Sequence, residues 1–425
     1  MRRIGAIGLC LPICFGLMFG AEAKAPAPKE RPAAPAWEAL GPEGGSISAL
    51  TLSPSSPNEL MALSGLAGFS QVFRTTNGGR SWERRATFDK TSWDLAFDPR
   101  DANVLTILTD TGILKSLNKG TSWTEFAFGA KRFSAGGKLA VHPADSDTIY
   151  ATGSYDVVTG KNCMAFYKSA DGGRTWTAVK FNASSNSGAA TALAVSPSRP
   201  STLYLAGFFS TGIAVSYRMY KSVNGGASWS VIGTEIADQV NALLVHPANP
   251  DKVWAATSWG IYRSADGGRT WQRNDGFAFG YSLAVDPANP NILYAGYDKK
   301  CYKSIDGGVN WTEFVSGLFG TGTDIVVTAP AIYFGSTGGI YKSTNGGQTW
   351  TAAHSGIQAS VIPALGVAPS SAGTVYIEFQ ADGFYRSFSS GNSWQRLPDF
   401  YRCDKVLRIV VNPTNPDKLY ILAGG

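Results

Sequence analysis

The sequence predicts an all-β protein built from repeated four-stranded antiparallel sheets, and three observations predict it. An octapeptide, Ser-Ala-Asp-Gly-Gly-Arg-Thr-Trp at residues 264–271, occurs in eight related copies along the chain. Short runs of alternating apolar residues separate the copies. The copies start 39 to 53 residues apart, and a period of roughly 40–50 residues made of short strands is typical of a β-propeller.

Each unit opens with a strand rich in small apolar residues, such as 192–195, which suits the crowded centre of a propeller. A turn containing Pro follows and ends that strand. A second strand, such as 292–295, and a third of the Gly-Ile-Tyr-Lys-Ser type lead into the octapeptide. The fourth strand begins at or just after the octapeptide's Trp. This register places the octapeptides and the Pro turns on one face.

The octapeptide predicts a tight turn between the third and fourth strands. Its third residue offers a side-chain oxygen to nearby backbone N–H groups, the glycines permit positive φ, and the Trp covers the hairpin with apolar surface. The third residues are Asn77, Asn118, Asp171, Asn224, Asp266, Asp306, Asn345 and finally Ser389, and the tryptophans are Trp82, Trp123, Trp176, Trp229, Trp271, Trp311, Trp350 and Trp394. Because a neutral oxygen serves as well as a carboxylate, the motif predicts a structural role rather than a metal site or a catalytic acid.

The octapeptide resembles the Asp-box of bacterial neuraminidase-type (BNR) repeats. The fuller unit, residues 241–264, resembles the blades of xyloglucan-hydrolysing propellers, sortilin-type receptor propellers and photosystem assembly-factor propellers. The resemblance covers nearly all of residues 37–425 and implies a propeller of about eight blades plus an incomplete one. It leaves the function open, because these families do different things on one scaffold.

The amino terminus predicts export. Residues 1–23 combine Arg2 and Arg3, an apolar stretch and the sequence Ala21-Glu22-Ala23, a pattern typical of a bacterial signal peptide, with an uncleaved anchor as the alternative. Residues 24–36 form a Pro- and Ala-rich linker, and residues 37–425 form the propeller. We therefore expect a secreted or periplasmic protein with no membrane span in the mature chain.

The remaining composition excludes several classes of site. The formal charge is +6 without a run of five Lys or Arg, so nucleic acid binding is not indicated. After the signal peptide the cysteines are Cys163, Cys301 and Cys403, which allow one disulfide or three thiols and have no metal-ligand spacing. His142 and His246 precede turn prolines, where other units have Ser, Asp or Asn, so they are interpreted as turn caps. No metal or cofactor is expected.

The number of units leaves two interpretations of the ring. Nine inner strands can be read but only eight octapeptides, and the last unit, residues 406–425, has two strands. Either an eight-bladed ring carries an extra piece, or the chain is the front part of a longer protein.

We expect the functional surface on the face opposite the octapeptides. The hairpins between second and third strands and the links between blades lie there and contain the irregular loops. Aromatic residues there suit stacking on sugars or contact with a protein partner, although packing between blades is the alternative for each. The predicted binding residues are Tyr155, Phe208, Phe209, Tyr217, Trp259, Tyr281 and Tyr297.

The predicted function is that of a secreted, non-catalytic, monomeric propeller that binds or assembles a protein or glycan on this face. The alternative is a glycoside hydrolase resembling the xyloglucan-active family, which needs two carboxylates. That resemblance places a catalytic Asp in the first blade, where this chain has residues 64–68 without a carboxylate. Asp110 one blade later and Asp298 in the sixth blade fill similar places. A sialidase is disfavoured, because the Arg-Ile-Pro signature is missing and Arg80, Arg174 and Arg269 lie in octapeptides.

Overall fold

The computed structural model describes most of the chain from Gly44 onward, and the described residues form strands and turns without a helix. The described ranges are 44–66, 68–128, 137–157, 161–181, 187–274, 280–297, 300–314, 318, 322–328, 331–353, 358–359, 364–367, 371, 374–379, 383–389, 393–397, 405–411, 415–417 and 419–424. The predicted signal peptide and linker lie outside them. This part of the chain contains no helix with the length and apolarity needed to span a membrane.

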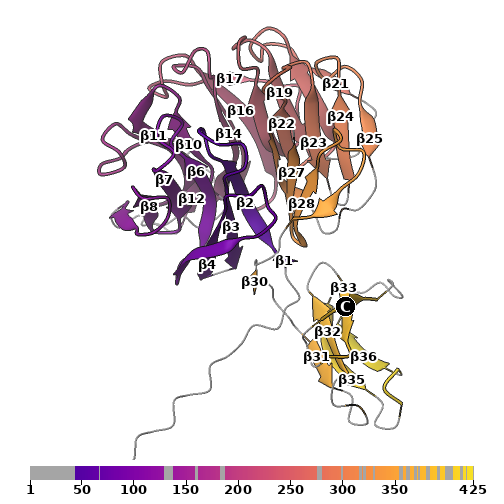
Figure 1. Ribbon diagram of the computed structural model, residues 1–425. Coiled ribbons are helices and arrows are strands. Elements are labelled where there is room, and N and C mark those ends of the chain that lie inside the picture. Colours follow the sequence, from indigo (N-terminus) through magenta and orange to yellow (C-terminus); the bar gives the residue numbers. More distant parts are fainter. Residues whose placement is uncertain are drawn as a thin grey trace, which may run out of the picture. The chain divides into compact units, whose positions relative to one another are not determined.

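Seven four-stranded antiparallel sheets, or blades, follow one another between residues 47 and 352 (Figure 1). The strands of blades one to three are β2 Ile47–Leu52, β3 Leu60–Leu66, β4 Phe69–Thr75 and β5 Glu83–Phe88; β6 Ser92–Phe97, β7 Leu105–Thr109, β8 Gly112–Ser116 and β9 Thr124–Ala127; β10 Leu139–His142, β11 Asp145–Val157, β12 Lys161–Ser169 and β13 Thr177–Lys180. Those of blades four to seven are β14 Ser187–Val195, β15 Leu203–Ser210, β16 Val215–Ser222 and β17 Ser230–Ile232; β18 Val240–Val245, β19 Val253–Thr257, β20 Gly260–Ser264 and β21 Gln272–Asn274; β22 Ser282–Val285, β23 Leu293–Tyr297, β24 Lys300–Ser304 and β25 Thr312–Phe314; β26 Gly322–Val327, β27 Ile332–Ser336, β28 Gly339–Ser343 and β29 Thr351–Ala352.

The ring closes between the first and the seventh blade. The inner strand β2 contacts β26, just as each inner strand contacts the next around the ring. Asp324 Oδ2 accepts the backbone N–H of Leu50 at 2.9 Å, and Lys342 Nζ donates to the carbonyl of Gly78 at 2.9 Å. The ring therefore has seven blades and not eight, because the seventh blade already supplies the partner groups that the first one needs.

Buried apolar residues fill the seven interfaces between neighbouring blades. At the closure, Ile47 and Phe73 of blade one pack with Tyr333 and Ile340 of blade seven. Equivalent clusters join every other successive pair, with Ile107 and Met61 in one of them. Trp254, in the second strand of blade five, is 3% exposed and belongs to the core.

Two further sheets follow the ring. An eighth four-stranded sheet contains β31 Ala364–Val367, β32 Val375–Phe379, β33 Gly383–Ser387 and β34 Gln395–Arg396, and a two-stranded sheet contains β35 Lys405–Val411 and β36 Leu419–Gly424. Tyr376 and Phe384 pack on Ile409 and Val411, so the two sheets contact each other as neighbouring blades do. Eight four-stranded sheets and one incomplete sheet among the described residues confirm the predicted count. A short parallel pair joins β1 Gly44–Gly45 to β30 Gln358–Ala359.

The histidines of the Pro turns act as the predicted caps. His142 Nδ1 accepts the backbone N–H of Ala144 at 3.2 Å, and His246 Nδ1 accepts that of Ala248 at 3.1 Å. Cys163 and Cys301 are buried thiols without a disulfide. Cys403 and His354 lie outside the described residues.

Candidate functional site

The octapeptides and the Pro turns lie on one face of the ring, as predicted. In the blades of the ring for which the contact is described, the fourth residue of the octapeptide donates its backbone N–H to a carbonyl at or just before the start of the second strand; this residue is Lys119 in blade two and glycine in the others. Examples are Gly267 to Asp251 at 2.8 Å and Gly172 to Asp147 at 2.9 Å. We call this side the octapeptide face. The opposite side, which carries the hairpins between second and third strands and the links between blades, is called the loop face.

Hydrogen bonds inside each octapeptide occupy its polar groups. In the copy at residues 264–271, Ser264 Oγ contacts Asp266 Oδ1 at 2.8 Å, and Gly268 N donates to Ser264 Oγ at 2.8 Å. The backbone N–H and the hydroxyl of Thr270 both donate to the Asp266 carboxylate. Asn224 makes the equivalent contact with the backbone of Ser228 at 2.9 Å, so the amide replaces the carboxylate as predicted.

These contacts also fix the ionisation of the octapeptide carboxylates. Hydrogen bonds from Thr270, first its hydroxyl and then its backbone N–H, hold the pKa of Asp266 far below its usual range. Donation from the backbone and side chain of Asn310 lowers the pKa of Asp306 to about 2. A carboxylate that is permanently ionised and saturated with donors is a poor general acid, which supports a structural role.

Lysine side chains link successive octapeptides around the ring. Lys115 Nζ donates to Gly172 O at 3.2 Å and Lys221 Nζ donates to Gly267 O at 3.0 Å, each reaching the next blade. The contact from Lys342 to Gly78 at the closure is of the same kind. The octapeptide face is therefore a repeated polar frame whose groups satisfy one another.

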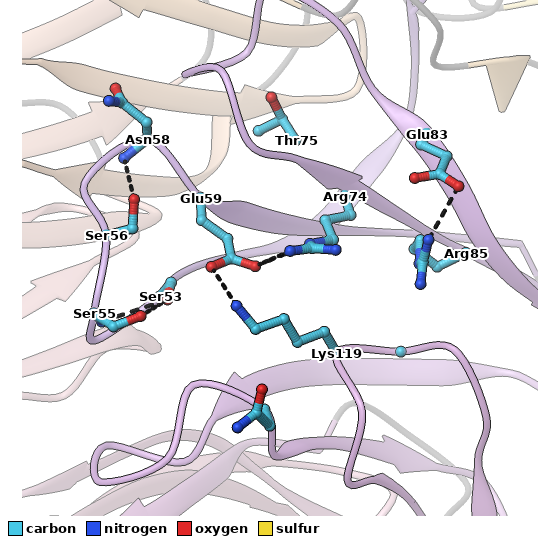
Figure 2. A network of polar contacts seen from close by, with 12 residues as sticks. Ser53, Ser55, Ser56, Asn58, Glu59, Arg74, Thr75, Glu83, Arg85 and Lys119 are labelled. Carbon is cyan, nitrogen blue, oxygen red and sulfur yellow. Dashed lines mark hydrogen bonds and ion pairs between the residues drawn. The ribbon is translucent and has the colours of Figure 1, made fainter.

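One junction in this frame departs from the pattern. Between blades one and two, Glu59 accepts Arg74 Nε at 2.9 Å and Lys119 Nζ at 3.1 Å (Figure 2). Glu59 is 5% exposed. Burial tends to raise its pKa, but the hydrogen bonds and charges of Lys119 and Arg74 lower it overall. The network joins two blades through a buried ionised carboxylate and has no exposed reactive group.

The loop face contains a polar cavity at the ring axis. Its volume is about 150 Å³, and all seven blades contribute to its wall. The lining residues are Ser48, Asp94, Lys138, Ala192, Leu193, Asn241, Ala242, Leu243, Tyr281, Ser282, Leu283, Thr323 and Asp324. Most of them stand just before or in the first half of the inner strands, while Ala192 and Leu193 lie beyond the middle of β14. The other ends of these strands run into the Pro turns of the octapeptide face. We call this space the axial cavity.

Bulges in the inner strands aim polar side chains into and across this region. The pairing of the first two strands shifts register between Ser92 and Asp94 and again between Gly322 and Asp324, and such bulges re-aim side chains. Asp94 Oδ2 accepts Leu139 N of the next blade at 2.9 Å. Each of these two carboxylates also accepts the backbone N–H of the residue that follows it.

The two carboxylates lie deep at the axis but keep partial exposure to the cavity. Desolvation raises the pKa of Asp324 to about 6; the backbone N–H of Leu50 and the charge of Lys138 oppose this, and the charge of Asp94 adds to it. Desolvation likewise raises the pKa of Asp94, against the charge of Lys138 and two backbone donors. Lys138 makes no ion pair with either of them in the described structure.

The predicted aromatic residues with described side chains differ in exposure: some are exposed, some are half-buried and one is buried. Trp259 is 60% exposed in the β19–β20 hairpin, and Tyr281 is 41% exposed at the wall of the axial cavity. Tyr281 stacks on Tyr297 with 5.5 Å between ring centroids. Phe208 and Tyr217 face each other across β15 and β16 and are half-buried.

The prediction that Phe209 is a binding residue is wrong. Phe209 is 4% exposed and packs in the core between blades three and four, because β15 extends through Ser210 and turns this ring inward. The side chain of Tyr155 lies outside the described residues.

Of the two alternative catalytic residues, the structure describes Asp110. Asp110 lies in the β7–β8 hairpin, and its Oδ1 is buried without a hydrogen-bond partner. Asp298 lies outside the described residues. Within the described ranges, no three His, Cys, Asp or Glu side chains gather in a way that could hold a metal ion.

Comparison with known proteins supports the fold. Residues 70–192 match the family model Sortilin-Vps10, described as sortilin, neurotensin receptor 3. No curated protein matches the chain significantly. The GH74 enzyme from Niastella koreensis has a TM-score of 0.63 and 18% identity, covering 91% of this chain and 70% of that one. An ancestral GH74 enzyme has a TM-score of 0.68 and 17% identity, with 89% and 58% covered.

A third similar structure is that of YCF48 bound to D1 peptide, with a TM-score of 0.51 and 15% identity, covering 70% of this chain and 93% of that one. At these identities the likeness shows the fold alone. The chain is a β-propeller that resembles the superfamily of sortilin, GH74 and YCF48 propellers. Because that superfamily contains both enzymes and binding proteins, the fold alone does not define the activity.

Proposed function

We propose that the protein is an exported, non-catalytic binding module that recognises a protein or glycan on its loop face. The observation that carries the proposal is the axial cavity with the exposed ring of Tyr281 in its wall, together with a second exposed aromatic side chain on the same face. Tyr281 forms part of the cavity wall and Trp259 projects from the hairpin of the preceding blade. Exposed aromatic residues at a concave polar site are typical of recognition surfaces.

The contrast between the faces supports this assignment. Polar groups of the octapeptide face are occupied by the repeat itself, whereas the axial cavity is lined by Asp94, Lys138 and Asp324 without ion pairs among them. A rigid closed ring holds these groups in place, so binding a ligand would cost little ordering of the protein. The similar YCF48 structure, which is bound to a peptide, is consistent with a polypeptide ligand.

The alternative function is glycoside hydrolysis, suggested by the likeness to GH74 enzymes. That chemistry needs one carboxyl group that can protonate a leaving group and a second across the scissile bond. Asp110 is the described candidate, but its Oδ1 is covered by protein, which argues against direct contact with a substrate.

The test combines arrays of glycans and peptides with a hydrolysis assay on xyloglucan. We expect saturable binding of at least one polymer class, a loss of affinity in Trp259→Ala and Tyr281→Ala, and no xyloglucan hydrolysis. Hydrolysis by the purified mature protein that Asp110→Ala abolishes would establish the enzyme instead. Binding that is indifferent to both aromatic substitutions would place the ligand elsewhere.

A further inference from the structure

A second junction of the octapeptide frame departs from the pattern. In blades three, four, six and seven, a Tyr of the second strand pairs with a Lys of the third, and the lysine nitrogen lies 5.2–5.8 Å from the centre of the Tyr ring. Blade five has Trp254 and Arg263 at these two positions. Trp254 Nε1 donates to Gly307 O in the next octapeptide at 3.0 Å, and Arg263 donates to Gln272 Oε1 of its own blade. The junction between blades five and six therefore lacks the lysine that those blades carry.

This change leaves space beside the octapeptide of blade six. A Cβ added to Gly172, Gly225 or Gly346, each the fourth residue of its octapeptide, would stand 3.0–3.2 Å from the lysine nitrogen of the preceding blade. At Gly307 the nearest atom is Asn291 Oδ1, 3.9 Å away. A cavity of about 120 Å³ lies there, and the residues that matter in its wall are His246, Lys252, Trp254 and Arg263 of blade five and Asp306 and Gly307 of blade six. We call this space the junction cavity.

Strand register brings the basic residues of the junction cavity to one side of blade five. His246 N donates to Lys252 O at 3.0 Å, which continues the pairing of β18 with β19 and sets these two residues opposite each other. Trp254 follows Lys252 by two positions and pairs directly with Arg263. Residues at such positions share one face of a sheet, with Cβ atoms about 4.5–5.5 Å apart when directly opposed. The His246 ring also stacks on Trp254 with 6.1 Å between ring centroids, so the three basic side chains meet at one cavity.

Positive charge and hydrogen-bond donors dominate this wall. Lys252 and Arg263 carry one positive charge each against the single carboxylate of Asp306, and two minus one leaves a net positive charge. The Asp306 carboxylate already accepts hydrogen bonds from its own octapeptide. Neither cation makes an ion pair within the described part of the chain. His246 Nδ1 accepts two backbone N–H groups, so the neutral ring carries its proton on Nε2, where it is a donor.

We propose that the junction cavity binds a monovalent oxyanion group, a carboxylate or a sulfate, with Lys252 and Arg263 as charged donors and His246 as a neutral donor. Such a group offers only acceptors to a wall of donors and brings the negative charge that the wall lacks. Hydrogen bonds from guanidinium and ammonium groups to an anion are roughly twice as strong as neutral ones. A cation would meet two positive charges, and a neutral group would leave them uncompensated. The site goes beyond the proposed function, because it lies on the octapeptide face.

Other features of the molecule carry less. Leu117, Val223 and Ile305 are exposed on the octapeptide face but stand on separate blades. Cys163 and Cys301 are buried thiols whose pKa values are raised by burial, which makes them unreactive.

The direct test is an NMR titration of the mature protein that follows the imidazole signals of its three histidines. Acetate and methyl sulfate are the probes, and acetamide and dimethyl sulfone are their neutral controls at the same ionic strength. We expect at least one anion to shift His246 saturably in about the millimolar range for a ligand of this size, and the neutral controls to leave it unchanged. His142, which caps the equivalent turn of blade three, is the internal control and should not move. The anion that binds more tightly distinguishes a carboxylate ligand from a sulfate ester.

Single substitutions separate the site from the general charge of this face. Arg263→Gln should weaken anion binding by about fivefold or more, because a charged donor in the wall is lost. Lys252 is exposed, so Lys252→Gln should fold normally, as checked by thermal unfolding, and weaken binding by about threefold. Arg80→Gln removes the same charge from the octapeptide of blade one, outside the cavity wall, and should change the affinity by less than about twofold, because salt screens distant exposed charges.

A double substitution fills the cavity without changing its charge. Trp254→Tyr with Arg263→Lys gives blade five the pair that blade four has in Tyr204 and Lys221. We expect the introduced ammonium to reach Gly307 as Lys221 reaches Gly267, to occupy the cavity and to abolish saturable anion binding, while thermal unfolding shows a folded protein.

The proposal is overturned if neither anion shifts His246 saturably, or if the neutral controls shift it as the anions do. It is also overturned if Arg263→Gln and Lys252→Gln both bind the anion as the wild type does. A folded double variant that binds with wild-type affinity would show that surface charge alone attracts the anion, and would overturn the site as well. If the double variant fails to fold, the two single variants still decide the outcome.

Discussion

The two faces of this ring use polar residues in opposite ways. On the octapeptide face, Ser264, Asp266 and Thr270 exchange hydrogen bonds within one turn, and lysines connect each turn to the next. On the loop face, Asp94 and Asp324 line the axial cavity and keep unused acceptor capacity. The comparison indicates that the repeated residues hold the scaffold and that the residues that break the repeat are available to a ligand.

The largest expected effect tests the packing of the octapeptide turn. Gly226 has φ +86°, and a Cβ there would stand 2.3 Å from Phe166 Cε1, a buried ring. Gly226→Ala should lower the free energy of unfolding by about 3–4 kcal/mol, because strain and overpacking add. Gly307→Ala is the matched control, since φ is +74° but the nearest atom lies 3.9 Å away. It should cost about 1–2 kcal/mol from backbone strain alone. Equal losses of unfolding free energy in the two variants, measured by urea unfolding, would show that contact with Phe166 adds nothing to the backbone strain.

The second prediction concerns the buried network of Figure 2. Glu59→Ala leaves Arg74 and Lys119 without their shared carboxylate and should cost about 3 kcal/mol, as removal of one partner from a buried ion pair does. Glu83→Ala, which breaks the exposed pair with Arg85, should cost at most about 0.5 kcal/mol. Comparable losses in the two variants would show that burial of Glu59 is unimportant.

The same network predicts a pH dependence. The pKa of Glu59 is lowered in the folded protein, so its stabilisation is present above the unfolded-state pKa of 4.5 and is lost as the pH falls through the folded-state value. The difference in unfolding free energy between wild type and Glu59→Gln should therefore shrink on acidification below about pH 4.5. A difference that stays constant across this range, measured by urea unfolding at each pH, would argue against an ionised Glu59.

The third prediction tests whether the octapeptide carboxylate is only an acceptor. Asp266→Asn should change the unfolding free energy by less than about 1 kcal/mol, because Asn224 already makes the same contacts in its own turn. Asp266→Ala should cost about 1–2 kcal/mol through unsatisfied backbone donors. Ligand binding should be unchanged in both variants. A loss of ligand affinity in Asp266→Asn would show that the ligand binds on the octapeptide face.

Local patterns determined how much of the fold could be predicted. Eight octapeptides fixed the hairpins, the strand order and the shared face, because each turn is made by residues close in sequence. The closure of the ring after seven blades depends on Asp324 and Leu50, which are 274 residues apart, and no local pattern reports that contact. Phe209 was misplaced because the length of β15 decides which way its side chain faces.

The axial cavity was missed for a related reason. Asp94 and Asp324 stand in inner strands where other blades have Ala49, Ala192 or Ala242, and a charge in a crowded strand was the available signal. Only the closed ring brings these two carboxylates and Lys138 to one cavity. The exposed positions of Trp259, in a hairpin, and of Tyr281, in the link between two blades, were predicted from local sequence.

One measurement compares the two faces most directly. A peptide selected from a random library on the mature protein is titrated against two double variants that each remove exposed apolar side chains. One is Trp259→Ala with Tyr281→Ala on the loop face; the other is Leu117→Ala with Val223→Ala, which are 70% and 65% exposed on the octapeptide face. We expect a loss of affinity of about tenfold or more in the first and none in the second. A loss confined to Leu117→Ala with Val223→Ala would contradict it.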